Sequence, residues 1–453
     1  NAMKVKVLSR NPEDYIRGTT SEINRLPRNL DPDLHPFEAA REYTRALNAA
    51  KLERVFAKPF LASLDGHSDG VNCLARNPVK VSSVASGACD GQIKFWHLQT
   101  RSCLKTVTAH SGFVRGITFS PSGQKLFSVG DDKTIKQWDV DHNEMIEPLS
   151  TYLHSKMMTG IHHHGKNATF ATCGEAVEIW DENRSIPVQT YSWGVDTVHS
   201  VKFNPIETHL VAATASDRSI MLYDTRGTSA LRKVIMKMRS NTIAWNPMEA
   251  FIFSAANEDS NAYTFDIRKL DSPVNVHIDH VGAVLDIDYS PTGQEFVTGS
   301  FDKTIRIFPR DRARSREVYH TSRMQRVFCV TFSGDATYVL SGSDETNIRL
   351  WKSHASEKLG PTNPRQRRDL KYSSKLKNQY QHHPEVKRIL KHRHVPKLIH
   401  KEAKEKRIML DSIKRKEENM RLHSKPGSMP VIPERKKHIV NRKKIKYQFW
   451  LLA

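Results

Sequence analysis

The sequence predicts an all-β fold built from seven similar units, and three observations support this prediction. A short stretch ending in an aromatic residue recurs every 42 or 43 residues. In five units an aspartate stands six residues before the aromatic, and the residues between alternate in polarity, as in DKTIKQW, which is typical of a strand. Asn-Pro or Ser-Pro turns separate further strand-like runs upstream. The seven aromatic residues are Trp96, Trp138, Trp180, Tyr223, Phe265, Phe308 and Trp351.

Seven units of this length resemble the WD-repeat family. The resemblance covers residues 59–352 and implies a seven-bladed β-propeller of four-stranded blades. In such a blade the outer strand follows the aromatic residue. For the unit that ends at Trp351, we expect residues 60–64 (FLASL) to supply that strand and close the ring.

Repeated His, Ser or Thr, and Asp residues invite comparison with a catalytic triad. The WD-repeat resemblance instead implies a buried hydrogen-bond network within each blade. Recurrence at successive periods favours this structural role, because a catalyst needs one site and not several. The residues assigned to these networks are His67, Ser86, Asp90, Trp96, His110, Ser128, Asp132, Trp138, His280, Thr298 and Asp302.

The net charge of +21 is concentrated at the end of the chain. Residues 352–453 hold 29 Lys and Arg against 9 Asp and Glu, whereas residues 59–351 hold 30 against 32. We therefore divide the chain into an N-terminal extension with one helix (3–58), the propeller (59–352) and a basic, partly helical C-terminal region (353–453). The helix follows Pro36, and we expect it to lie against the ring or a partner. Five dispersed cysteines suit a reducing compartment.

Both flanks carry motifs that general WD proteins lack. The chain begins with KVKVLSRNPEDYIRG, and its C-terminal region contains SEKLG, HRHVPK and HSKPGS. Together with FNPIET and WNPMEAFIF within the repeats, these stretches closely resemble the Sof-type WD-repeat proteins. The resemblance implies a protein of the nucleus and nucleolus that belongs to the small-subunit processome, with pre-ribosomal RNA and processome proteins as partners. No role is assigned to residues 445–453.

The histidine-rich stretch 382–416 raises three alternatives. A metal site is disfavoured because lysines and arginines surround the imidazoles, and we expect neither metal nor cofactor. A membrane-surface helix is disfavoured because charges interrupt its apolar stripe. An RNA-gripping arm that also carries nuclear-import signals fits the charge best. The histidines are His382, His383, His392, His394 and His400. The basic residues assigned to RNA or import are Lys387, Arg388, Lys391, Arg393, Arg435, Lys436, Lys437, Arg442, Lys443 and Lys444.

Two consecutive repeats continue past the aromatic with an Asp-x-Arg box: Asp224 with Arg226, and Asp266 with Arg268. Substrate receptors of cullin-RING ubiquitin ligases in the WD family present such boxes to their adaptor. The aspartate can fix the arginine, whose forked guanidinium then projects as a donor. The alternative is that the aspartate belongs to the ordinary repeat ending and the arginine is a surface residue. In the third repeat, Arg184 comes one residue late.

The leading hypothesis is a non-enzymatic assembly factor required for pre-rRNA processing and small ribosomal subunit biogenesis. In this hypothesis the propeller is a protein platform, and the basic region contacts RNA. The alternative is a substrate receptor of a cullin-RING ligase, and the two roles are compatible. Neither requires a membrane or a small-molecule substrate.

Overall fold

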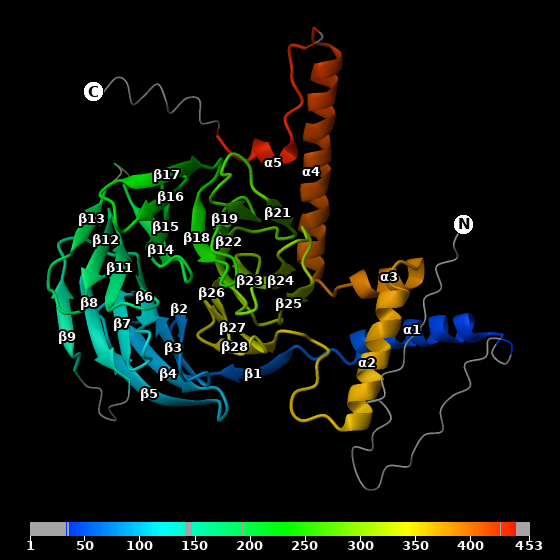
Figure 1. The fold of residues 1–453 in the computed structure, drawn as a ribbon, viewed down its shortest axis with the longest axis horizontal. Coiled ribbons are helices and arrows are strands. Elements are labelled where there is room, and N and C mark those ends of the chain that lie inside the picture. Colours follow the sequence, from blue (N-terminus) through cyan, green and yellow to red (C-terminus); the bar gives the residue numbers. More distant parts are fainter. Residues whose placement is uncertain are drawn as a thin grey trace. The chain divides into compact units, whose positions relative to one another are not determined.

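The computed structural model describes residues 33, 36–140, 147–192, 194, 196–425 and 427–440. Residues 60–352 of this described part form seven four-stranded antiparallel sheets. The first strands of neighbouring sheets contact one another around a closed ring, so each sheet is one blade of a propeller (Figure 1). The predicted fold class is confirmed.

In blades 1 to 6 the strands follow chain order from the centre of the ring outwards, and in blade 7 the outermost strand is β1. Blade 1 contains β2 (Val71–Arg76), β3 (Ser83–Ala88), β4 (Gln92–His97) and β5 (Ser102–Thr108); blade 2 contains β6 (Val114–Phe119), β7 (Lys125–Gly130), β8 (Thr134–Asp139) and β9 (Ser150–Leu153). Blade 3 contains β10 (Gly160–His163), β11 (Thr169–Cys173), β12 (Val177–Asp181) and β13 (Gln189–Tyr191); blade 4 contains β14 (Val198–Phe203), β15 (Leu210–Ala215), β16 (Ser219–Asp224) and β17 (Ala230–Ile235). Blade 5 contains β18 (Ser240–Trp245), β19 (Ile252–Asn257), β20 (Asn261–Asp266) and β21 (Asn275–Ile278); blade 6 contains β22 (Val284–Tyr289), β23 (Glu295–Ser300), β24 (Ile305–Pro309) and β25 (Glu317–Tyr319). Blade 7 contains β26 (Val327–Phe332), β27 (Tyr338–Ser343), β28 (Ile348–Lys352) and β1 (Phe60–Leu64).

Blade 7 is built from both ends of the propeller sequence. Its three inner strands come last in the ring, whereas its outer strand β1 precedes the first blade. β1 runs antiparallel to β28, with Phe60 opposite Trp351 and Leu64 opposite Ile348. The predicted closing strand is therefore confirmed.

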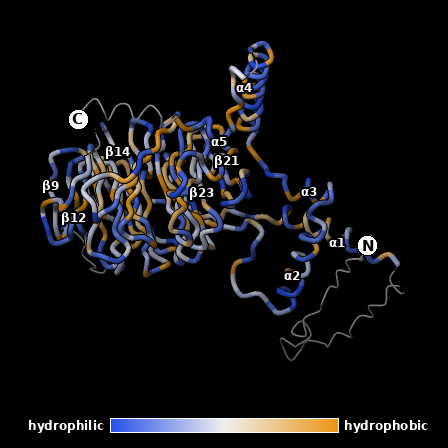
Figure 2. The backbone as a smooth tube through the Cα atoms, turned by 45° about the horizontal axis from the view of Figure 1, so that its top comes forward, coloured by the Kyte–Doolittle hydropathy of each residue, from blue (hydrophilic) through white to orange (hydrophobic). Residues whose placement is uncertain are grey.

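The periodic aromatic residues form the packing between blades. All seven are at most 2% exposed, from Trp96 to Trp351. Trp180 stacks on Phe170 of the neighbouring strand in its own blade, and Trp351 of blade 7 stacks on Tyr319 of blade 6. Apolar residues accordingly follow the strands of the ring in Figure 2. Burial of so many large rings is the main stabilising contribution of the repeat.

The periodic aspartate shapes the turn between the second and third strands of a blade. Asp132, for example, accepts the backbone N–H of Thr134 at 3.2 Å. The residue after the aspartate has a positive φ, which is 60° at Lys133 and 82° at Gly91. Such a backbone is unfavourable for residues other than glycine, and the aspartate bond offsets that cost by fixing the turn. This role explains why the aspartate recurs in blades without a histidine.

The histidine networks are complete in blades 2 and 6. His280 Nδ1 donates to Asp302 at 2.9 Å, and its Nε2 accepts from Thr298 at 2.7 Å. Burial lowers the pKa of His280, which keeps the imidazole neutral. Burial alone would raise the pKa of Asp302, but His280 and Thr304 hold it well below its usual value.

Blade 2 repeats this chain with His110, Asp132 and Ser128, and Trp138 donates its indole N–H to Ser128 at 2.9 Å.

Blade 1 departs from the pattern. His67 Nε2 lies 2.6 Å from Ser86, and Trp96 donates to the same hydroxyl at 2.8 Å. The Nδ1 atom of His67, however, is buried without a partner, and Asp90 accepts from Ser68 and from the backbone of Gln92 instead. The network of this blade therefore lacks the hydrogen bond between histidine and aspartate.

The helical segments fall into two groups. One compact unit comprises residues up to Lys58 together with His354–Arg393, and the other comprises Pro59–Ser353 together with His394 onwards. The first unit contains α1 (Glu38–Val55), α2 (Pro364–Gln379) and α3 (Pro384–Lys391). The second adds α4 (Lys397–Leu422) and α5 (Glu434–Lys437) to the propeller. Among the described residues, no helix is long and apolar enough to cross a membrane.

The first unit joins the N-terminal helix to the C-terminal region. Ala46 and Ala50 of α1 are fully buried, and small side chains let the helices approach closely. Tyr43 donates to Glu385 at 2.7 Å, and Lys377 pairs with Glu53 at 2.6 Å. The sequence leads us to expect that the ring or a partner covers α1. The structure packs it on α2 and α3, whose sequence carries no sign of this pairing.

Because the network is complete in blade 6 but not in blade 1, replacing the aspartate should lower the unfolding free energy more in blade 6 than in blade 1. Asp302→Ala removes a buried acceptor that bonds His280 and Thr304, so we expect a loss of about 3 kcal/mol of unfolding free energy. Asp90→Ala in blade 1 is the matched control and should cost about 1 kcal/mol, since its histidine is not bonded to it. Urea unfolding at pH 7 measures both. Equal losses would contradict the structural interpretation of these networks.

Candidate functional surfaces

The two Asp-x-Arg boxes adopt the same geometry in blades 4 and 5. Arg226 donates from Nη2 to Asp224 at 2.8 Å, and Arg268 donates to Asp266 at 2.9 Å. In both boxes the aspartate also accepts the backbone N–H of the arginine. These bonds lower the pKa of each aspartate, and the hydrogen bond from the guanidinium has the largest effect. Both arginine side chains nevertheless remain more than two-thirds exposed. Each guanidinium is thus held in place with donors left for a partner.

Two further contacts fix the second box. The guanidinium of Arg268 lies 4.8 Å from the ring centre of Phe251. Arg232 of β17 donates to the backbone carbonyls of Ile267 and Arg268 at 2.8 and 3.3 Å. An arginine of blade 4 therefore supports the turn of blade 5, which sequence spacing does not reveal. In blade 3, Asp181 accepts from Asn183, and the exposed Arg184 follows one residue later.

The predicted basic residues lie in both compact units. Lys387, Arg388 and Lys391 are exposed on α3 of the first unit, and Arg393 there donates to the carbonyl of Leu390. Arg435 and Lys436 are exposed on α5 of the second unit. Arg442, Lys443 and Lys444 lie outside the described residues. The exposed basic residues of α4 are not assigned individually from the sequence and include Lys404, Lys414 and Lys416.

The five histidines of the tail do not converge. His382, His383 and His392 belong to the first unit, whereas His394 and His400 belong to the second. His383 packs against Tyr43 in a tilted arrangement, with 4.4 Å between ring centres, and His394 stacks on His320 of the propeller. Among the described residues, no group of three or more potential ligands could hold a metal ion.

Comparison with known proteins agrees with this architecture along almost the whole chain. The model of the WD domain, G-beta repeat, matches residues 58–97, 101–139, 186–224, 271–308 and 316–352, and the model of the Sof1-like domain matches residues 353–439. DDB1- and CUL4-associated factor 13 of Homo sapiens is 60% identical over 441 residues, which are 97% of this chain and 99% of that protein. The protein of that name from Xenopus laevis is 58% identical over the same shares. Protein SOF1 of Saccharomyces cerevisiae is 46% identical over 97% of this chain and 94% of its own length. The chain belongs to the Sof1-like WD-repeat family.

The Sof1-like domain is not one compact body in the structure. Its first part, up to Arg393, packs with α1, whereas its second part, from His394, belongs to the propeller unit. One part completes a small helical unit, and the other attaches to the ring.

A half-buried lysine attaches the first half of α4 to the propeller. Lys406 donates from Nζ to the hydroxyl of Ser260 and to the carbonyl of His280 at 3.2 Å. Partial burial lowers the pKa of Lys406. In the sequence this residue is one of many lysines that could be solvated, and only the fold shows that it bonds to the ring.

A clasp formed by Glu417, Lys437 and Ile439 attaches the other end of this region. Lys437 of α5 pairs with Glu417 of α4 at 2.7 Å, and hydrogen bonding to Glu417 and Glu434 raises the pKa of Lys437. Ile439 packs on the core between blades 4 and 5 and pairs with Met236 as a short antiparallel bridge. Lys437, assigned from the sequence to RNA or import, is therefore engaged within the chain.

The clasp predicts a local effect of one apolar contact. Ile439→Asp should release residues 423–440 from the ring, because a carboxylate cannot be buried against that core without a partner. Trypsin should then cleave at Arg435 and Lys436 at least about tenfold faster, while the midpoint of propeller unfolding barely changes. Val431→Asp, at a position 71% exposed, is the control and should leave cleavage slow. Similar cleavage rates in both variants would show that Ile439 is not the anchor.

Proposed function

We propose that this protein is a non-enzymatic assembly factor of the nucleolus that acts in the maturation of small-subunit ribosomal RNA. The observation that carries the proposal is similarity to Protein SOF1 and its animal relatives over 97% of the chain, including both flanks of the propeller. A WD-repeat ring is most often a platform for partners, so the flanks carry the distinguishing information.

The geometry supports a binding role for the propeller. In blades 2 and 6, the His-Ser/Thr-Asp groups that resemble catalytic triads have buried histidines, and their side chains are engaged in hydrogen bonds within the blade. The most exposed charged groups lie instead on turns and on the C-terminal helices. These are suited to contacts with macromolecules.

Charge supports RNA as one of those macromolecules. The C-terminal region holds 29 Lys and Arg against 9 Asp and Glu, and many of these basic residues are exposed on α2, α3 and α4. Ion pairs along α4, such as Lys401 with Glu405 at 3.9 Å, neutralise only a few. Such a surface binds phosphate backbones with little sequence preference and with strong salt dependence.

Replacement of Lys387, Arg388 and Lys391 by Gln tests this role. We expect weaker binding to single-stranded RNAs of different sequence by similar factors, and a log–log salt slope shallower by about 2, because each lost phosphate contact removes about 0.7. Fluorescence anisotropy at several salt concentrations measures both quantities. The control replaces Arg101, Lys133 and Lys166, which are exposed on propeller turns, and so removes the same charge. Identical losses in both variants would reduce the effect to net charge and contradict a local RNA surface.

A second function is favoured by the two Asp-x-Arg boxes. We propose that Arg226 and Arg268 contact DDB1, the adaptor that the names of the animal relatives mention, and that the protein thereby also serves as a substrate receptor of a CUL4 ligase. Two forked donors of the same geometry on neighbouring blades support this proposal. An isolated surface arginine would need no such fixed aspartate.

The double variant Arg226→Ala with Arg268→Ala should weaken DDB1 binding at least about tenfold, a loss of ~1.4 kcal/mol in binding free energy. The thermal unfolding midpoint should stay unchanged, since both side chains are exposed. Arg184→Ala, one residue out of place in blade 3, is the control and should bind normally. Calorimetry with purified DDB1 gives the affinities. Undiminished binding by the double variant would remove the ligase role from these boxes.

A further inference from the structure

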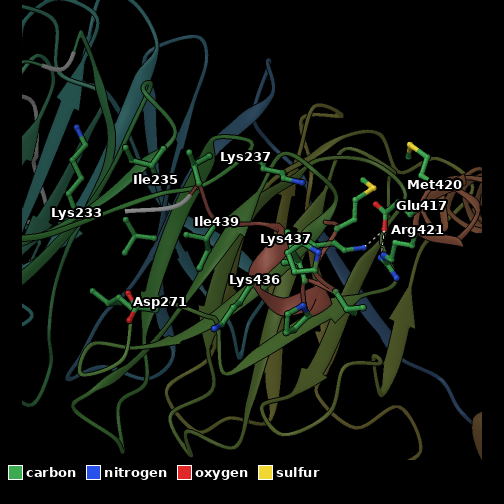
Figure 3. A pocket seen from close by; sticks show the side chains of 18 residues that line it. Lys233, Ile235, Lys237, Asp271, Glu417, Met420, Arg421, Lys436, Lys437 and Ile439 are labelled. Atoms are coloured by element: carbon green, nitrogen blue, oxygen red, sulfur yellow. Dashed lines mark hydrogen bonds and ion pairs between the residues drawn. The ribbon is translucent and has the colours of Figure 1, made fainter. Parts of the chain in front are cut away.

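The outer edge of blade 4 carries a groove of about 950 Å³, and of the residues assigned from the sequence only Lys436 and Lys437 line it. Three stretches of the propeller unit form its walls: β17, the last turns of α4, and residues 429–440 (Figure 3). A volume of this size accommodates several side chains of a ligand.

The two walls formed by the C-terminal region are fixed to the ring. Glu417 holds Lys437 at 2.7 Å and Arg421 at 3.4 Å, so α4 and α5 are joined across the groove. The backbone N–H of Lys237 donates to His438, and that of Val440 donates to Ile235. The groove therefore exists before any ligand arrives, which lowers the entropic cost of binding.

The groove is lined by apolar side chains that remain exposed to water. Met420, Met429, Val431 and Ile432 are between 45% and 71% exposed. Their neighbour Leu270 at the floor belongs to the buried core. A contiguous exposed apolar surface of this kind marks an interaction site, and methionines adapt well to varied ligands.

The charges around this apolar lining are predominantly positive. The lining contains five basic residues against two acidic ones, Asp271 and Glu417. Among the described residues neither Lys237 nor Lys436 has an ion-pair partner, although both face the groove. The complementary ligand therefore carries acidic groups.

The edge strand indicates an extended protein segment. β17 is the outermost strand of blade 4, and within the described residues only the bridge at Met236 adds to that edge. An extended segment can continue the sheet there through backbone hydrogen bonds while its side chains enter the groove. RNA fits less well, because none of the described residues that line the groove is aromatic and could serve as a stacking platform.

We propose that this groove binds, in trans, an extended segment of another protein that carries large apolar residues flanked by Asp or Glu. The segment lies along β17, its apolar side chains contact Met420, Val431 and Ile432, and its carboxylates pair with Lys237 and Lys436. The site is separate from the Asp-x-Arg boxes and needs neither RNA nor the ligase adaptor.

The test uses the full chain and an array of peptides of about ten residues, the length of a long strand. Each peptide places acidic residues around two large apolar residues in a Val- and Thr-rich background. One matched array replaces the acids by Lys, and another replaces the apolar residues by Ser. We expect binders in the first array and none in the other two.

Variants then locate the site. Val431→Asp with Ile432→Asp should weaken the best binder at least about tenfold, and so should Lys237→Glu with Lys436→Glu. The second variant should bind the lysine-substituted form of that same peptide, a gain that mere misfolding cannot produce. Ile408→Asp with Met409→Asp is the control, because these residues are equally exposed on α4 but do not line the groove.

Three results would overturn the proposal. Equal binding by the groove variants and the control would place the peptide elsewhere. Competition by an oligouridine that the groove variants abolish would make the occupant RNA. A chain ending at Val440 that binds the peptide about tenfold tighter would make residues 441–453 the native occupant.

Discussion

The pairing of β1 with β28 joins the two ends of the propeller sequence, and it brings together the chain segments that lead into both flanks. The backbone N–H of Lys352 donates to the carbonyl of Pro59 at 2.8 Å, and that of Lys58 donates to the carbonyl of Ala355 at 3.1 Å. The chain segments before β1 and after β28 are therefore hydrogen-bonded to each other. Helices that lie more than 300 residues apart in sequence, α1 and α2, then meet as if joined by a short linker, so their packing costs little further chain entropy.

The sequence was informative wherever a structural requirement repeats. An aromatic residue every 42 or 43 residues and an aspartate at the same place in five units predicted seven blades and the closing strand, including the blades ending at Trp180 and Phe265 outside the matched WD stretches. Contacts that do not recur from repeat to repeat leave no periodic pattern in the sequence. The packing of α1 on α2 depends on Ala46 and Ala50, which alone indicate nothing about a partner. The Asp-x-Arg geometry could be anticipated because Asp224 and Arg226 are local to each other, whereas the support from Arg232 comes from another blade.

The positive charge of the C-terminal region is partly consumed by folding. Lys377 pairs with Glu53, Lys406 donates hydrogen bonds to Ser260 and His280, and Lys437 pairs with Glu417. Each of these lysines fastens a helical segment at one point. The basic side chains on the exposed faces of α2, α3 and α4 stay available for phosphates. Net charge alone therefore overstates the surface open to RNA, and only the fold separates the two groups.

Strand β17 links the surfaces proposed for different partners. Side chains alternate across a strand, so Arg232 and Lys233 point to opposite faces. Arg232 supports the turn that carries Arg268, while Lys233 and Ile235 border the groove. A segment added along the outer edge of β17 would stiffen the strand, and neither Arg226 nor Arg268 is among the residues that line the groove. The groove and the boxes can thus be occupied together, and roles in assembly and in a ligase need not exclude each other on this part of the ring.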